Sequence, residues 1–179
     1  MDITLEQLKR ISPQSGPRAA IFLPWINAAM HKYGIITAAR QRAFLAQFGH
    51  ETGQLRHMRE LWGPTPAQQR YEGRIDLGNT LPGDGKRFMG RGLPQITGRA
   101  NYIACSQALF GDDRLLVNPE LLEQPQWACE SGGWYWSSRR LNALADQAQF
   151  ASITKRINGG LNGQVARLAL LQRAQQVIP

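Results

Sequence analysis

Apolar residues recur at three- and four-residue intervals along most of this chain, which is the spacing of one buried face of a helix. This spacing, together with capping residues, prolines and glycines at the ends, predicts helices over residues 5–11, 17–33, 38–50, 99–110, 119–123, 125–138, 141–150, 153–157 and 163–177. Strict alternation of apolar and polar residues, the pattern of a half-buried strand, is scarcely visible. The chain is therefore predicted to be mainly α.

The segment 62–93 interrupts the helical pattern with a composition rich in Gly, Pro, Asn and Asp. These residues favour turns, so we expect a loop-rich central segment with a short pairing of extended stretches. Loops of this kind often carry functional residues, because glycine lets the backbone approach a ligand closely.

The size and charge of the chain indicate how many domains it has and what kind of partner it attracts. Its 179 residues, 42% hydrophobic and 19% charged, suffice for one domain with a buried core. The formal charge of +8 should attract polyanions such as nucleic acid, anionic lipid or an anionic cell wall. Because the basic residues are scattered singly or in pairs, the pattern argues against a nucleic-acid partner.

No stretch is apolar and long enough to span a bilayer, and the first ten residues lack the pattern of a signal peptide. We therefore expect synthesis in the cytosol. Cys105 and Cys129 form no CxxC pair, and in a reducing compartment they are expected to be free thiols.

Four polar clusters stand out against the helical background, at residues 49–53, 59–60, 90–102 and 157–163. The first contains Glu51 at the end of an apolar helix, an environment that favours a protonated carboxyl group. The second contains Glu60, which is expected to be ionised beside solvent and a neighbouring cation. Two carboxyl groups in opposed environments are what acid–base glycoside hydrolysis requires.

Other interpretations of the same residues stay open at this point. Taken alone, Glu51 is equally typical of a structural ion pair, and Glu60 of a solvated surface charge. His50 and Glu51 also begin the HExxH pattern of a zinc peptidase, but Gln54 stands where the second histidine would be. We therefore predict neither a metal site nor a cofactor.

The chain resembles glycoside hydrolase family 19 in four features that follow one another in the family's order. These are GHETG, a glutamate nine residues after the glutamate of that motif, FMGRGLPQITGRANY, and INGGLNG. This family contains chitinases and phage endolysins, and the resemblance covers about residues 44–167. It implies a lysozyme-like helical fold with a substrate cleft, and an inverting mechanism without a covalent intermediate. The short interval between the two glutamates resembles the bacterial and phage members, which favours the phage or prophage endolysin branch.

The resemblance also implies roles for individual residues. Glu51 matches the general acid, Glu60 the general base, and Thr97 the hydroxyl that helps to hold the attacking water. The residues implied to bind sugar or to orient the carboxylates are Gln95, Asn101, Asn158, Arg167 and, beside the cleft, His50.

Two departures from the family pattern qualify these expectations. Phe88 stands near the position where relatives commonly carry tyrosine, which bears on the choice of sugar. The segment between Glu60 and Gly90 is shorter than in several phage endolysins, which argues against a separate small helical lobe there.

The expected substrate is the β-1,4-linked backbone of peptidoglycan, with chitin as the alternative. We expect one catalytic domain over residues 1–179, with room for two lobes around a cleft and without a separate wall-binding module. The protein is expected to be a monomer, made in the host cytoplasm, that acts on the cell wall after holin-type release and can contact anionic membrane or wall polymers. A non-catalytic wall-binding protein and a basic nucleic-acid-binding protein are the rival classes.

Two apolar features of the second half are predicted to be structural. The helix over 163–177 is expected to close the core with its apolar face, and Arg167 is expected on its polar face with Gln172 and Arg173. The residues of the expected apolar face are Val165, Leu168, Ala169, Leu171 and Val177. The aromatic residues at 127 and 134–136 are also expected in the core, where one exposed ring would be free to stack on a sugar.

Overall fold

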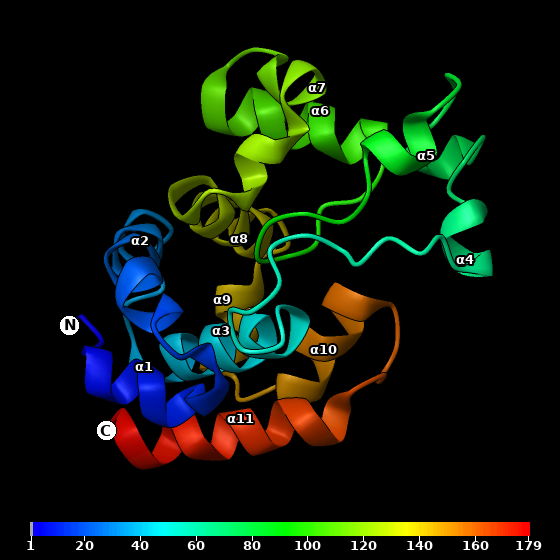
Figure 1. The fold of residues 1–179 in the computed structure, drawn as a ribbon. Helices are drawn as coiled ribbons and strands as arrows, with labels where there is room; N and C mark the ends of the chain where they lie inside the picture. Colours follow the sequence, from blue (N-terminus) through cyan, green and yellow to red (C-terminus); the bar gives the residue numbers. More distant parts are fainter. Residues whose placement is uncertain (1) are drawn as a thin grey trace.

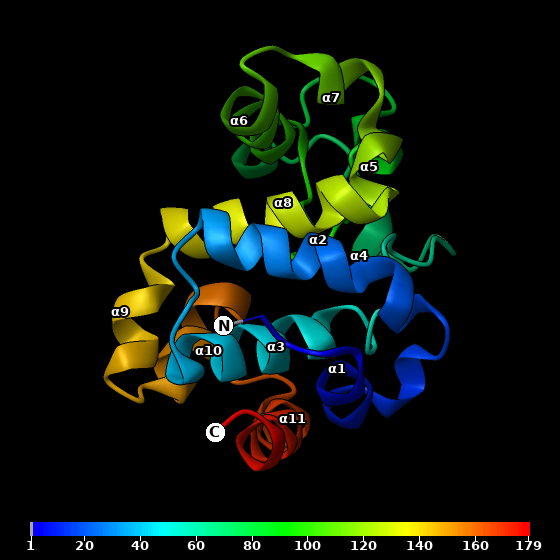
Figure 2. The same ribbon diagram turned by 90° about the vertical axis from the view of Figure 1, so that its left-hand side faces the viewer.

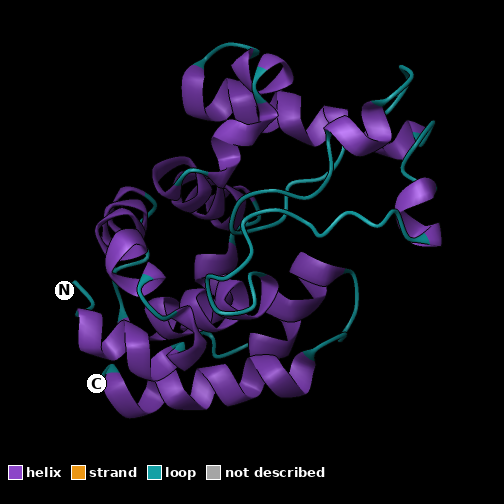
Figure 3. Cartoon of the chain, in the orientation of Figure 1, coloured by secondary structure: helices purple, strands orange, loops and turns teal. Residues whose placement is uncertain are grey.

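The computed structural model describes residues 2–179 and is mainly helical, with long loops in its central segment, as Figures 1 and 3 show. The α-helices are α1 (Leu5–Ile11), α2 (Arg18–Lys32), α3 (Ala38–Glu51), α4 (Pro66–Gln69), α5 (Asp84–Arg87), α6 (Arg99–Phe110), α7 (Arg114–Val117), α8 (Pro125–Ser138), α9 (Leu141–Asp146), α10 (Phe150–Asn158) and α11 (Gln164–Val177). Short 3-10 turns lie at η1 (Pro13–Ser15), η2 (Ile75–Leu77) and η3 (Pro119–Glu123). The predicted mainly α, lysozyme-like fold class is confirmed.

The helices form two lobes, each with its own apolar core (Figures 1 and 2). We call the part built from α1–α3 and α9–α11 the large lobe, and the part built from α4–α7 with the surrounding loops the small lobe. Helix α8 lies between them and contributes to both cores, because Trp136 belongs to the large-lobe core while Trp127 and Trp134 pack on the small-lobe core. No helix in the described part of the chain is long and apolar enough to cross a membrane.

Helix α3 runs through the large lobe and ends at its edge. Thr37 caps its first turn by accepting a hydrogen bond from the Arg40 backbone N–H at 3.3 Å. Phe44 and Phe48 stack edge-on to each other and to Trp136, with ring centroids 4.8 to 6.2 Å apart. This packing fixes the helix along its length, so its last residue, Glu51, is presented from a rigid element.

The central segment is more ordered than its composition predicts. Helices α4 and α5 and the turn η2 form inside it, and the isolated antiparallel bridges Arg59–Arg91 and Arg91–Ile96 supply the predicted pairing of extended stretches. These elements belong to the small lobe, whose core is built from residues between Phe88 and Leu122. Helices of four residues are too short to show an apolar period, which is why the sequence did not reveal them.

The predicted helix over 141–150 was also wrong. The chain leaves the helix after Asp146 and starts a new one at Phe150, because Ala148 adopts a left-handed conformation with φ +54°. Neither glycine nor proline marks this break in the sequence, so periodicity alone extended the helix across it.

The buried face of α11 differs in part from the predicted one. Val165 is 84% exposed and Leu168 40% exposed, whereas Arg167 is buried with only 2% of its surface accessible. Leu171 and Val177 pack against the core as predicted, beside the buried Leu170 and Ala174. A buried partner for the guanidinium, which lies in the site described below, explains why Arg167 turns inward.

The aromatic residues of α8 and the two cysteines behave mostly as predicted. Trp136 is fully buried, while its neighbours Trp134 and Tyr135 are half-buried against the cores. Cys105 and Cys129 are free, buried thiols. Burial raises the pKa of Cys105 to about 12, which keeps the thiol protonated and unreactive at neutral pH.

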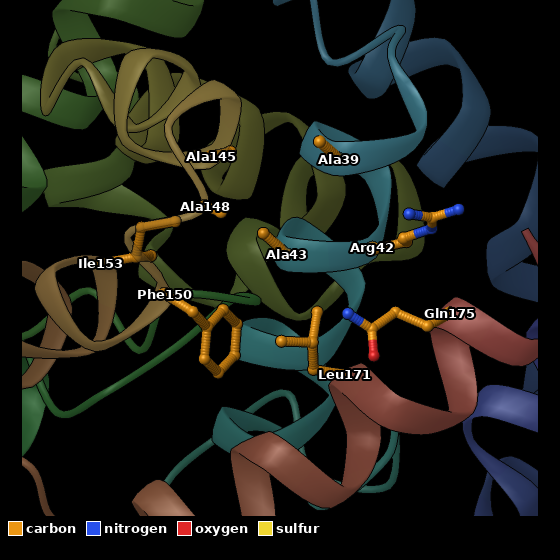
Figure 4. Close-up of a pocket in the computed structure, with 9 residues that line it drawn as sticks. All are labelled: Ala39, Arg42, Ala43, Ala145, Ala148, Phe150, Ile153, Leu171 and Gln175. Carbon is orange, nitrogen blue, oxygen red and sulfur yellow. The ribbon is translucent and has the colours of Figure 1, made fainter.

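An apolar cavity of about 180 Å³ lies between α3, α9, α10 and α11 (Figure 4). Its lining residues are Ala39, Arg42, Ala43, Ala145, Ala148, Phe150, Ile153, Leu171 and Gln175. Neither predicted catalytic glutamate lines it. It is a packing gap of the large lobe, and we assign no chemistry to it.

The strained residue at the α9–α10 break generates a stability prediction. Ala148→Gly should raise the free energy of unfolding by about 0.5–1 kcal/mol, because relief of the left-handed strain, roughly 1–2 kcal/mol, exceeds the entropic cost of glycine. Ala143→Gly, at an exposed position inside α9, is the matched control and should lower the free energy of unfolding by about 1 kcal/mol. Urea unfolding measures both, and a loss of stability in both variants would show that Ala148 is unstrained.

Candidate active site

Glu51 ends α3 with its carboxylate held by a buried cation. Its Oε1 atom accepts a hydrogen bond and ion pair from Nη2 of Arg167, on α11. The Glu51 side chain keeps 19% of its surface accessible, so it lies at the boundary between the core and solvent. A charged hydrogen bond of this kind fixes the direction of the carboxyl group.

A chain of buried hydrogen bonds supports this pair. Arg167 donates through Nη1 to Oε1 of Gln47 at 2.7 Å, and Gln47 donates through Nε2 to Oγ1 of Thr154 at 2.8 Å. Thr154 in turn donates to the backbone carbonyl of Phe150 at 3.3 Å. Since each polar group in this hydrogen-bond network has a partner, the network can lie in the core without a large desolvation penalty.

These contacts correct two sequence-based expectations. The environment of Glu51 is not simply apolar, because a guanidinium contacts the carboxylate directly. Of the two roles implied for Arg167, its burial fits the orientation of a carboxylate and not direct contact with sugar. It lies behind Glu51, with its Nε also 3.4 Å from the carbonyl oxygen of Asn162, and its contacts are those of a residue that positions the carboxylate.

Glu60 is held in a different way, by neutral donors. Its Oε1 accepts from Nε2 of Gln68 at 3.0 Å and from the Tyr71 hydroxyl at 3.3 Å, and its Oε2 accepts from the Gly90 N–H at 3.1 Å. Burial and the charge of Glu60 together raise the pKa of Tyr71, which keeps that hydroxyl a donor. Three donors suit the acceptor-only, ionised form of a carboxyl group.

The cation expected beside Glu60 has another carboxylate as its ion-pair partner. Arg59 lies 3.8 Å from a carboxylate oxygen of Glu123, which is already bonded by Arg91 at 2.8 Å. Arg59 nevertheless lines the same hollow as Glu60, so its charge stays close to that carboxylate.

A close backbone approach at Gly90 brings the third predicted catalytic residue to the site. A β-carbon at Gly90 would lie 2.8 Å from Oε1 of Gln95 and 3.2 Å from Oγ1 of Thr97, so a larger residue here would displace these two side chains. Gly90 also donates its N–H to Glu60, so this one glycine contacts the Glu60 carboxylate and faces the Gln95 and Thr97 side chains. Asn101 donates to the Thr97 carbonyl at 2.7 Å and supports this turn from the start of α6.

The remaining predicted residues gather around Glu51. Asn158, at the end of α10, donates to the carbonyl of Asn162 at 3.3 Å and so braces the loop that contacts Arg167. His50 packs against Gly163, where a β-carbon would approach its ring to 2.3 Å. Burial, and secondarily the charge of Arg167, lower the pKa of His50, partly offset by Glu51.

Four residues that hold the carboxylates were not predicted from the sequence: Gln47, Thr154, Gln68 and Tyr71. Gln47 carried a usable signal, because it precedes Glu51 by four residues on one helix and therefore shares its face. Gln68 belongs to a capping box with Thr65, which was recognisable as a helix start and not as a contact of Glu60. Nothing in the sequence pairs Thr154 with Gln47, 107 residues away.

A hollow of about 440 Å³ opens beside Glu60. Its lining residues are Arg59, Glu60, Leu61, Trp62, Lys86 and Met89. It combines a carboxylate, an aromatic ring and two cations at the junction of the extended stretch with the small lobe. This composition suits a polar ligand with apolar faces, such as a sugar.

Comparisons with known proteins agree with this geometry. A protein of Haemophilus influenzae described as a glycosyl hydrolase family 19 domain-containing protein is 31% identical over 166 residues, covering 77% of this chain and 80% of the relative. An endochitinase of Arabidopsis thaliana is 33% identical over 129 residues, and this chain covers 42% of its length. A scan against models of protein families finds no match.

Solved structures give the same answer for the fold. Chitinase C from Streptomyces griseus superposes with a TM-score of 0.77 at 27% identity, over 98% of this chain and 76% of that one. A bacterial family 19 chitinase superposes with a TM-score of 0.77 at 26% identity, over 98% of this chain and 94% of that one.

The helical two-lobed fold and these relatives define a glycoside hydrolase. More narrowly, the chain belongs to glycosyl hydrolase family 19.

The buried network behind Glu51 generates the first prediction for the site. Thr154→Val removes the acceptor of Gln47 at constant shape, and should lower the free energy of unfolding by about 1–3 kcal/mol. It should also reduce kcat, since Gln47 anchors Arg167 and thereby Glu51. Thr154→Ser keeps the hydroxyl and is the matched control. Urea unfolding and kcat measure the two effects, and equal stability of both variants would contradict this account.

His50 generates a second prediction, on pH. Its pKa is lower in the folded chain than its ordinary value of 6.5, so the unfolded chain binds the proton more readily and acid favours unfolding. Below pH 6.5, stability should therefore fall until the lowered pKa is passed. His50→Gln should flatten this dependence between pH 7.5 and 5, as measured by urea unfolding, with the exposed His57→Gln as the control for loss of an imidazole. An unchanged slope in His50→Gln would refute the assignment.

Proposed function

We propose that this family 19 glycosidase is an endolysin-type enzyme that cleaves the β-1,4 amino-sugar backbone of peptidoglycan by single displacement. Glu51 acts as general acid, Glu60 as general base, and Thr97 helps to position the attacking water. The observation that carries the proposal is a pair of carboxyl groups, each fixed in direction by its own hydrogen-bond framework: Glu51 by the buried guanidinium of Arg167, and Glu60 by neutral donors.

The acid step follows from how Arg167 holds Glu51. Because Arg167 engages Oε1, the proton to be donated resides on Oε2 of Glu51. Donation of this proton to the glycosidic oxygen lets the bond to the anomeric carbon break as the oxocarbenium character develops. Arg167 then stabilises the carboxylate that remains.

The base step takes place at Glu60. An inverting enzyme needs its carboxyl groups about 6.5–9.5 Å apart, so that a water molecule fits beneath the sugar ring. Glu60 removes a proton from this water as it attacks the anomeric carbon. The Thr97 hydroxyl and the Gln95 amide, which meet Gly90 beside Glu60, are suited to orient the water, and such positioning lowers the barrier. Asn101 and Asn158 act as supports in this scheme.

The choice of peptidoglycan rests on charge. A formal charge of +8 attracts an anionic wall, whereas chitin is neutral. Action at the cell wall after release from the cytoplasm, contact with anionic membrane or wall polymers, a monomeric state and a single catalytic domain belong to the same proposal. Chitin hydrolysis is the second candidate, because the plant relatives and the solved structures are named chitinases.

One experiment tests both the chemistry and the substrate. Gram-negative sacculi and chitin hexamer are digested by the wild type, by Glu51→Gln and Glu60→Gln, and by Glu6→Gln, an exposed control on α1. Mass spectrometry of the products should show hydrated reducing-end sugars from sacculi. Glu51→Gln should lower kcat at least about a hundredfold, since the amide cannot donate the proton. NMR of the first products should show the α-anomer.

The alternatives give different results in this experiment. Peptide fragments without new reducing ends would indicate an amidase and refute the proposal. Cleavage of chitin hexamer without cleavage of sacculi would establish the chitinase. If Glu51→Gln retains full activity on the preferred substrate, the assignment of the acid is wrong.

A further inference from the structure

The hollow beside Glu60 holds two positive charges that the acid–base chemistry does not use. Arg59 and Lys86 both line it, together with Trp62. Glu60 already has its three neutral donors, from Gln68, Tyr71 and Gly90. The two cations are therefore not needed to hold the catalytic carboxylate.

Both cations remain available to a ligand. Arg59 is 59% exposed, and its carboxylate partner, Glu123, lies 3.8 Å away and is bonded more closely by Arg91 at 2.8 Å. Lys86 is exposed in the last turn of α5 and forms no ion pair with any residue in 2–179. A loose pair and an unpaired ammonium group at one hollow provide an unsatisfied positive field.

The walls of the hollow suit a sugar chain that carries acids. Trp62 is half-buried with its ring 6.3 Å from that of Tyr71, and Leu61 beside it is exposed, so one side is apolar. Arg59 and Lys86 line the same hollow as these apolar groups. An amino sugar bearing a carboxylate meets both requirements, whereas a chain of neutral amino sugars leaves the cations unused.

We infer that Arg59 and Lys86 form a carboxylate-binding subsite next to Glu60, which distinguishes acidic from neutral amino-sugar chains. The inference rests on the proposed function and deepens it. Peptidoglycan carries two kinds of carboxylate: the lactyl group of its N-acetylmuramic acid, free in strands without peptides, and the acids of the peptide stem. Arg59 offers a fork for a bidentate contact, and Lys86 a point charge.

The test compares substrates that differ only in charge. Peptide-free glycan strands carry the lactyl carboxylates, and amidation of these strands with carbodiimide and ammonia neutralises them. Intact, peptide-bearing strands supply the stem acids, and chitin hexamer is the neutral reference. The variants are Arg59→Gln, Lys86→Gln and the double variant, with Lys9→Gln, an exposed lysine on α1, as the matched loss of charge elsewhere.

The readout is the ratio of kcat/KM for acidic strands to that for their amidated form. For the wild type this ratio should exceed one. Each single variant should lower it about three- to fivefold and the double variant about tenfold, mainly through KM, as expected for partly exposed ion pairs. Lys9→Gln should keep the wild-type ratio. At 0.5 M salt the wild-type ratio should fall toward one, because exposed charges are screened.

The outcomes separate the subsite from the proposed function. If the wild type cleaves acidic and amidated strands equally well, the subsite is refuted while peptidoglycan hydrolysis stands. If it cleaves chitin hexamer alone, the proposed function fails and the subsite with it. An effect of the variants on peptide-free strands assigns the lactyl carboxylate as the ligand, and an effect confined to peptide-bearing strands assigns the stem. If the double variant keeps the wild-type ratio on both peptide-free and peptide-bearing strands, the inference is overturned.

Discussion

The guanidinium of Arg167 is the constraint on which the large lobe depends. A charge with 2% of its surface accessible is costly unless every donor has a partner. Its partners come from α3, through Gln47 and Glu51, and from the loop after α10, through Asn162. Helices α3 and α11 therefore cannot shift relative to each other without leaving a buried charge unpaired. The rigidity that orients Glu51 is a consequence of this cost.

Glu60 depends on a different kind of framework. Its hydrogen-bond donors are a glycine N–H, a capping-box glutamine and a tyrosine hydroxyl, all contributed by loops and short helices of the small lobe. Arg91 stabilises these loops by donating hydrogen bonds to Glu123, to the Tyr102 hydroxyl and to the backbone carbonyl of Arg87. One carboxylate is thus fixed by helix packing and the other by turn geometry, which is how two similar side chains acquire unlike surroundings.

The sequence predicted the parts of this arrangement that depend on local pattern. Apolar periodicity and the Thr37 cap identified α3 and delivered Glu51 at its end. The long-range partners were not predictable in the same way. Arg167 lies 116 residues from Glu51, and without that partner a cation in an amphipathic helix is assigned to the polar face. The break at Ala148 was missed because its cause is a backbone conformation that its residue type does not favour.

The division into two cores has a consequence for inactivation by heat. The small-lobe core is the smaller of the two, and it is built around Phe88, Tyr102 and Leu122. Regions with less buried apolar surface open at lower free energy than the whole domain. Local melting of that core would displace Glu60 while Glu51 stayed in place on α3. Loss of catalysis on heating would then precede loss of most helical structure, and cooling before global unfolding would restore it.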